Sequence, residues 1–97
     1  MQHRMAEPDH VTGLEPRGRL EEFFAARCPP GETVALVMCD VVGLKEVNER
    51  DGFRAGDACL RRAADRLRTA APTACILARL GGDELVAVFT GRDPAAR

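Results

Sequence analysis

Carboxylates stand at the ends of two apolar runs in this chain. Asp40 follows the run 34–39, and Asp83 and Glu84 come directly before a second run. Two or three carboxylates that converge at strand ends form a hard oxygen site, suited to magnesium or manganese carrying the phosphates of a nucleotide. In two-metal phosphoryl chemistry such ions activate the attacking hydroxyl and neutralise the leaving oxygens. The spacing of these residues alone justifies a candidate cation site and nothing more.

Small and polar residues nearby suit the same chemistry but also have purely structural interpretations. Gly81 and Gly82 let the backbone approach an anion and point its N–H groups at it, yet a Gly-Gly turn also joins a hairpin without any ligand. Lys45, the only lysine of the chain, can supply a point charge to phosphates. Asp57 falls in the first turn of a predicted helix, where the dipole favours a negative charge, and Asn48 can simply end a short helix.

Apolar periodicity and turn signals predict six elements in the order helix, strand, helix, helix, strand, strand. The spacing of Leu20, Phe23 and Phe24 is helical up to about residue 27, and Cys-Pro-Pro-Gly at 28–31 ends that helix. Six apolar residues between turn signals at 34–39 predict a strand buried on both faces. The remaining elements are helices over 44–50 and 55–71 and strands over 75–80 and 84–90, with an apolar stripe on the longer helix at Leu60, Ala64, Leu67 and Ala71.

This element order fits the first two-thirds of a ferredoxin-like βαββαβ unit, which places the chain in the α/β (α+β) class. The glycines at 81–82 join the last two strands as a hairpin. A right-handed crossover returns the chain to the same sheet, so that the second hairpin strand can insert beside the first strand. We therefore expect Asp40, at the end of the first strand, to lie near Asp83 at the hairpin tip.

Composition limits the partners and the compartment of the chain. The formal net charge of -1 gives no basic field of the kind that collects nucleic acid. No apolar run approaches the ~20 residues needed to cross a membrane, and the N-terminus has no apolar core for a signal peptide. Four widely spaced cysteines and two histidines favour reduced thiols over disulfides. We expect one small cytoplasmic domain without a nucleic-acid or membrane partner.

Three motifs, in this order and spacing, resemble the GGDEF domain of diguanylate cyclases. The chain carries RLGGDELVAVF at 79–89, which resembles the R-x-G-G-D-E-F signature in a GGDEL variant. It carries CDVVGLKEVNERDGFRAGDACL at 39–60, which is similar to the family's D-x-D-x-F-K-x-x-N-D-x-x-G-H-x-x-G-D-x-x-L segment. It also carries DHVTGL at 9–14, which resembles the opening D-x-L-T-G-L. The resemblance implies a ferredoxin-like nucleotidyl cyclase palm, truncated after the signature hairpin, with a flexible lead-in over 1–8 and a partial GGDEF domain over 9–97.

The resemblance implies metal-binding and catalytic roles for five residues. Asp40 and Asp83 would hold magnesium or manganese, with the Val41 carbonyl as a backbone ligand. Asp83 would also draw the proton from the 3′-hydroxyl of a nucleotide, with Glu84 beside it. Lys45 would steady the phosphates in the transition state.

The resemblance also implies that the substrate is GTP. Asn48 and Asp57 would read the guanine edge by hydrogen bonds, and Gly82 would meet the phosphates through its backbone. The implied reaction condenses two GTP into cyclic di-GMP and pyrophosphate in a homodimer, because each subunit holds one GTP. Two alternatives stay open. One is a catalytically silent short GGDEF module that binds GTP or pairs with a full-length cyclase as a regulator; the other, a different nucleotide-polymerising palm, is disfavoured by the full signature.

The chain departs from the family pattern at positions that none of these roles uses. The departures are Val42, Leu44, Glu49, Phe53 and Leu85, in place of aspartate, phenylalanine, aspartate, histidine and phenylalanine in that order. Pro72 and Cys75 stand where the family's product-inhibition site has arginine and aspartate, so we expect no inhibition of that kind. The family continues past the hairpin with a helix, a strand and a late segment that grips the triphosphate, so we expect an open sheet edge and an uncovered sheet face here.

Overall fold

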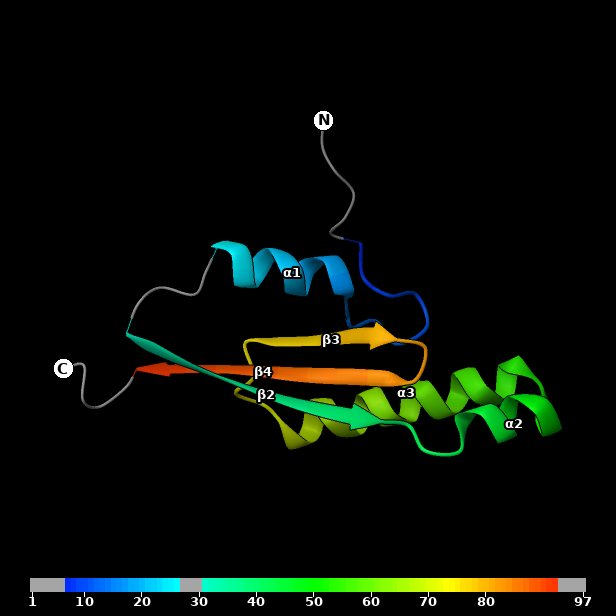
Figure 1. The fold of residues 1–97 in the computed structure, drawn as a ribbon. Coiled ribbons are helices and arrows are strands. Elements are labelled where there is room, and N and C mark those ends of the chain that lie inside the picture. Colours follow the sequence, from blue (N-terminus) through cyan, green and yellow to red (C-terminus); the bar gives the residue numbers. More distant parts are fainter. Residues whose placement is uncertain (1–6, 27–30, 93–97) are drawn as a thin grey trace.

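The computed structural model describes residues 7–26 and 31–92, which form a mixed α/β arrangement of one sheet and flanking helices (Figure 1). The elements are β1 (Glu15–Pro16), α1 (Arg17–Ala26), β2 (Glu32–Asp40), α2 (Leu44–Asp51), α3 (Phe53–Ala70), β3 (Ile76–Gly81) and β4 (Glu84–Arg92). The predicted order of six elements is confirmed, with ends that differ by a few residues. The sequence did not predict β1, because two residues are too few to show any periodicity. Most of the predicted lead-in over 1–8, and the predicted helix stop at 28–30, lie outside the described residues.

The sheet has the strand order β1-β3-β4-β2. Strand β4 runs antiparallel to both β3 and β2, while β1 pairs with β3 in parallel. The second strand of the hairpin therefore inserts beside the first long strand, as the topology argument predicted. A register shift between Arg79 and Gly81 makes the β3–β4 hairpin irregular just before its turn.

The core lies on both faces of the central strand β4. Val86 and Val88 point to one face, where they pack with Leu20 of α1, and Leu85 points to the other, where it packs with Ala64 of α3. Figure 1 shows α1 and α3 on opposite sides of the sheet, in agreement with this alternation. The predicted apolar stripe of α3 faces the protein: Leu60, Ala64 and Ala71 are buried and Leu67 is half-buried.

Strand β2 differs from the prediction that it would be buried on both faces. Leu36, Val37 and Met38 are 47%, 48% and 58% exposed. The physical reason is that β2 lies at the edge of the sheet, beside β4 alone, and the core clusters of α1 and α3 centre on β3 and β4. A continuous apolar run does not distinguish a covered central strand from an apolar edge strand, so the sequence pattern was ambiguous at this point. Within the described residues the expected open edge is present at β2, but the expectation of an uncovered sheet face is not met, because α1 packs on one face and α3 on the other and only β2 stays exposed.

Two further expectations concern cysteines and membranes. Cys39, Cys59 and Cys75 are free thiols, while Cys28 lies outside the described residues. Within 7–26 and 31–92, no helix is long and apolar enough to cross a membrane.

Candidate active site

The acidic residues of β2 and of the hairpin converge at one end of the sheet. In the β2–β4 register Asp40 lies directly opposite Glu84. One residue further on, the Val41 N–H donates a 2.9 Å hydrogen bond to the Asp83 carbonyl. Asp40 and Asp83 are exposed and Glu84 is half-buried, so water and ligands can reach all three carboxylates. The predicted proximity of Asp40 and Asp83 is therefore observed.

The donor set at this end suits a magnesium ion that arrives with a nucleotide. The Val41 carbonyl accepts only a long bond of 3.4 Å, from Leu44 N–H, which leaves it able to bind a cation. Among the described residues no group of three or more His, Cys, Asp or Glu side chains is arranged to hold a metal by itself. Magnesium keeps several waters and is bound by one or two carboxylates plus substrate phosphates, rather than by an all-protein cage. Asp40, Asp83 and the Val41 carbonyl fit that description.

The Gly-Gly turn beside these carboxylates is held in shape by Arg79. Its Nε donates to the Gly81 carbonyl at 3.2 Å and its Nη2 to the Gly82 carbonyl at 2.8 Å. Its Nη1 forms an ion pair with Asp9 at 3.1 Å, in which both side chains are less than one-fifth exposed. Gly82 itself is exposed, and a β-carbon placed there would meet nothing within 4 Å. The turn is thus fixed from behind by Arg79 while its outer side stays open to a ligand.

Asp9 in turn organises the loop that opens the domain. Its Oδ2 accepts hydrogen bonds from Thr12 N–H and Thr12 Oγ1, both at 2.8 Å, and a longer one from Val11 N–H at 3.2 Å. Burial by itself would raise the pKa of the Asp9 carboxyl, but the Thr12 hydrogen bonds and the Arg79 guanidinium together lower it below its ordinary value of 3.8. In the sequence Asp9 and Arg79 are parts of two motifs, and neither residue was predicted to have a role. The only sequence signal for the Asp9–Arg79 contact was that each residue is part of a motif.

The two predicted base readers lie where α2 and α3 pack together. Asn48 is on α2 and Asp57 on α3, and both are half-buried. Gly56 makes this packing possible, because a β-carbon there would lie 1.7 Å from the Asn48 Oδ1 atom. The Asn48 amide therefore sits directly over the residue that precedes Asp57. Lys45 is exposed in the first turn of α2.

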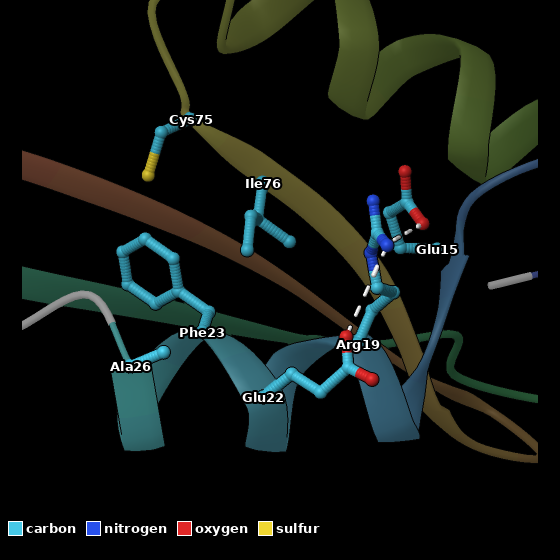
Figure 2. Close-up of a pocket in the computed structure, with 7 residues that line it drawn as sticks. All are labelled: Glu15, Arg19, Glu22, Phe23, Ala26, Cys75 and Ile76. Carbon is cyan, nitrogen blue, oxygen red and sulfur yellow. Dashed lines mark ion pairs between the residues drawn. The ribbon is translucent and has the colours of Figure 1, made fainter. Parts of the chain in front are cut away.

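A cavity of about 370 Å³ lies elsewhere, between α1 and the start of β3 (Figure 2). Figure 2 shows Phe23, Ile76 and the thiol of Cys75 around it, on the side away from Arg19. Arg19 is neutralised by Glu15 at 3.6 Å and Glu22 at 3.9 Å, so its charge is not free for a phosphate. None of the predicted site residues lines this cavity, and we do not assign the nucleotide to it.

The antiparallel β2–β4–β3 core with acidic residues at one end of the sheet defines a nucleotidyl cyclase palm. A family model described as diguanylate cyclase, GGDEF domain, matches residues 6–97, and the chain belongs to the GGDEF domain family. The GGDEF domain of DgcB from Caulobacter crescentus, solved in complex with c-di-GMP, has the same fold with a TM-score of 0.76 and 28% identity. That match covers 99% of this chain and 58% of the DgcB chain.

Two curated relatives illustrate the range of proteins that contain such a domain. An uncharacterized signaling protein of Caulobacter vibrioides is 40% identical over 95% of this chain, and the match spans 12% of that protein. The diguanylate cyclase DgcP of Pseudomonas aeruginosa is 35% identical over 91% of this chain, and the match spans 14% of its length. The chain therefore corresponds to a small part of each of these relatives.

Proposed function

We propose that this chain carries out diguanylate cyclase chemistry, in which two GTP molecules condense into cyclic di-GMP and pyrophosphate. The observation that carries the proposal is the backbone pairing of Asp40 and Val41 with Glu84 and Asp83, beside a Gly82 turn that is open to a ligand. Membership of the GGDEF family and the similarity to the diguanylate cyclase DgcP support it. On this proposal the domain comprises residues 9–97 and acts in the cytoplasm, where GTP is available.

The residues at the acidic end, together with Lys45 and Gly82, divide the proposed reaction between metal binding, proton transfer and phosphate binding. Asp40, Asp83 and the Val41 carbonyl hold Mg2+ or Mn2+, which when bound neutralises phosphate charge. Asp83 accepts the proton of the 3′-hydroxyl as that oxygen attacks the α-phosphate of the other GTP, whose bond to the β-phosphate breaks so that pyrophosphate leaves. Two such attacks give cyclic di-GMP and two pyrophosphates, and Glu84 stands beside Asp83. Lys45 places a positive charge near the phosphates, and the Gly82 backbone approaches them closely because no β-carbon intervenes.

The proposed substrate selectivity depends on α2 and α3. Asn48 and Asp57 hydrogen-bond the polar edge of guanine, and adenine would leave these half-buried groups unpaired. Each subunit positions one GTP, so the 3′-hydroxyl bound by one subunit attacks the α-phosphate bound by the other. A homodimer, or a pair with another GGDEF protein, is therefore the proposed active form.

A second candidate function is a catalytically silent module that binds GTP or pairs with a full-length cyclase as a regulator. The apolar and exposed strand β2 favours it, because an open strand edge is suited to pairing with another chain. This candidate predicts binding without turnover.

The proposed function is tested by incubating the purified chain with GTP and Mg2+ and separating the products by chromatography. We expect cyclic di-GMP from the wild-type chain and at least about a 100-fold loss with Asp83→Ala, since removing a catalytic acid–base group costs about 10²–10⁴ in rate. Glu21→Ala, which removes an exposed carboxylate of α1 far from the site, serves as the matched control and should keep full activity.

Circular dichroism must show that both variants remain folded. A folded wild-type chain that binds GTP but makes no product would support the silent module instead. Product that persists in Asp83→Ala would exclude the proposed role of Asp83.

A further inference from the structure

Phe53 is a large apolar residue whose side chain is exposed to solvent. It begins α3 and is 74% exposed, whereas Leu60 and Ala64 on the same helix are 2% and 0% exposed. Positions 53, 60 and 64 share one side of the helix, so Phe53 continues the apolar stripe of α3. Figure 1 shows why the stripe is uncovered here: the first turns of α3 extend beyond the strand ends, alongside α2.

The polar neighbours of Phe53 are the two residues proposed to read guanine. Asp57 is four residues further along α3, so the two side chains lie on the same side of the helix, one turn apart. Gly56, three residues after Phe53, is the position over which the Asn48 amide packs. An aromatic ring and two hydrogen-bonding side chains therefore lie on neighbouring turns where α2 and α3 pack together.

The backbone fixes this arrangement through a one-residue connection. Gly52 links α2 to α3 with a φ of 91°, in the region that favours glycine. Its N–H donates to the Asn48 carbonyl at 2.9 Å, and its carbonyl accepts from Gly56 N–H at 3.2 Å. Phe53 is therefore held at a set position relative to Asn48 before any ligand binds.

We propose that Phe53 is a base-binding residue, whose ring stacks on the face of the guanine that Asn48 and Asp57 hold by its edge. This inference rests on the proposed function, since it takes GTP as the ligand. A purine has a polar edge and an apolar face, and this end of the α2–α3 pair carries a matching group for each: Asn48 and Asp57 for the edge and Phe53 for the face. Aromatic stacking tolerates any base, so Phe53 supplies affinity while Asn48 and Asp57 supply the choice of guanine. The family pattern has histidine at this position, so the phenylalanine ring is a feature of this chain.

The absence of tryptophan and tyrosine from the sequence allows a direct test by fluorescence. In the variant F53W the only tryptophan stands at the proposed stacking position, and a guanine stacked on it quenches its emission. We expect saturable quenching by GTP and by GMP, and loss of the quenching when Asp57→Ala is added. F24W, at an exposed position of α1, is the matched control and should not respond.

Affinity measured by calorimetry separates this inference from the proposed function. Phe53→Ala should weaken GTP and GMP on the order of ten-fold or more, within the usual range for removing one stacked ring, while F53W retains wild-type affinity. If the wild-type chain binds GTP but Phe53→Ala binds it equally well and F53W is not quenched, the stacking role is wrong and the proposed function stands. If the wild-type chain binds neither nucleotide, both are wrong.

Discussion

Arg79 and Asp9 meet from positions 70 residues apart and form a nearly buried ion pair behind the signature turn. The same guanidinium donates to the carbonyls of Gly81 and Gly82. Charge-assisted hydrogen bonds of this kind are stronger than neutral ones and impose geometry. Asp9 therefore acts on the proposed active site through Arg79, although it does not belong to the acidic end of the sheet.

The lowered pKa of Asp9 predicts a stability that depends on pH. Its carboxylate is stabilised in the folded state, so its contribution is fully present above the unfolded pKa, near 3.8, and is lost as the pH falls through the lower folded value. We expect Asp9→Asn to reduce the free energy of unfolding by about 1–3 kcal/mol at pH 7, as for the loss of a charged hydrogen-bond partner. Urea unfolding at pH 7 and at pH 3 measures both values.

The difference between wild type and Asp9→Asn should shrink at pH 3, because below the ordinary pKa of 3.8 the Asp9 carboxylate of the unfolded chain takes up a proton more readily than that of the folded chain. Glu21→Gln is the control, since its pair with Arg17 is largely exposed and surface pairs contribute little. An equal difference at both pH values would show that the Asp9 charge is not what stabilises the loop.

At the residue scale the sequence predicted that Asp40 and Asp83 lie close together. The reason is that Asp40 ends one strand, and Asp83 stands at the turn of the hairpin whose second strand pairs with it. It could not predict the Asp9–Arg79 pair. That contact depends on how a short irregular loop closes on itself through Thr12, and no periodicity reports such a closure. The roles of Lys45, Asn48 and Asp57 stay predictions that came from the family resemblance.

Among the elements, α2 and α3 pack closely only because Gly56 has no side chain. A methyl group at this position would lie 1.7 Å from the Asn48 Oδ1 atom, so the Asn48 side chain or the helices must move. Overpacking usually costs about 1–3 kcal/mol, and the change from glycine to alanine returns about 1 kcal/mol in helix propensity. We therefore expect Gly56→Ala to lower the free energy of unfolding by up to about 2 kcal/mol. Urea unfolding followed by circular dichroism measures the net effect.

The matched control removes the Asn48 side chain with which the new β-carbon at position 56 would collide. In an Asn48→Ala background, the same Gly56→Ala change should be neutral or stabilising, because the amide is no longer in the way. Destabilisation of equal size in both backgrounds would mean that Asn48 does not limit the approach of the two helices.

Element existence and order followed from the sequence because stripes and turn residues are local signals. The long stripe of α3 and the Gly-Gly hairpin are examples. The exposure of β2 did not follow, since burial of a strand depends on which elements lie over it and not on its own composition. Strand β2 has a neighbouring strand on one side only. That position depends on the strand order of the sheet, and the run of apolar residues in β2 does not reveal it.

For the molecule as a whole, the open edge of β2 predicts self-association that needs no nucleotide. Exposed apolar edge strands pair with other chains, and lysine on an edge prevents this. We expect sedimentation of the wild-type chain to depend on concentration without GTP, and Met38→Lys to remain monomeric over the same range. Thr69→Lys adds the same charge at an exposed site of α3 and should leave the association unchanged. Association that persists in Met38→Lys would rule out the β2 edge as its cause.

The pairing of β2 with β4 also bears on the order in which the molecule folds. The β3–β4 hairpin and the α2–α3 pair join neighbouring segments, whereas the register of Asp40 with Glu84 closes a loop that contains α2, α3 and β3. Closing a long loop costs more chain entropy than forming a local contact, and distant contacts form more slowly. Strand β2, like β1, has a single neighbouring strand, although its register with β4 runs along the whole of β2. The carboxylates of the proposed active site are thus brought together by a contact between distant segments, which we expect to form later than the β3–β4 hairpin.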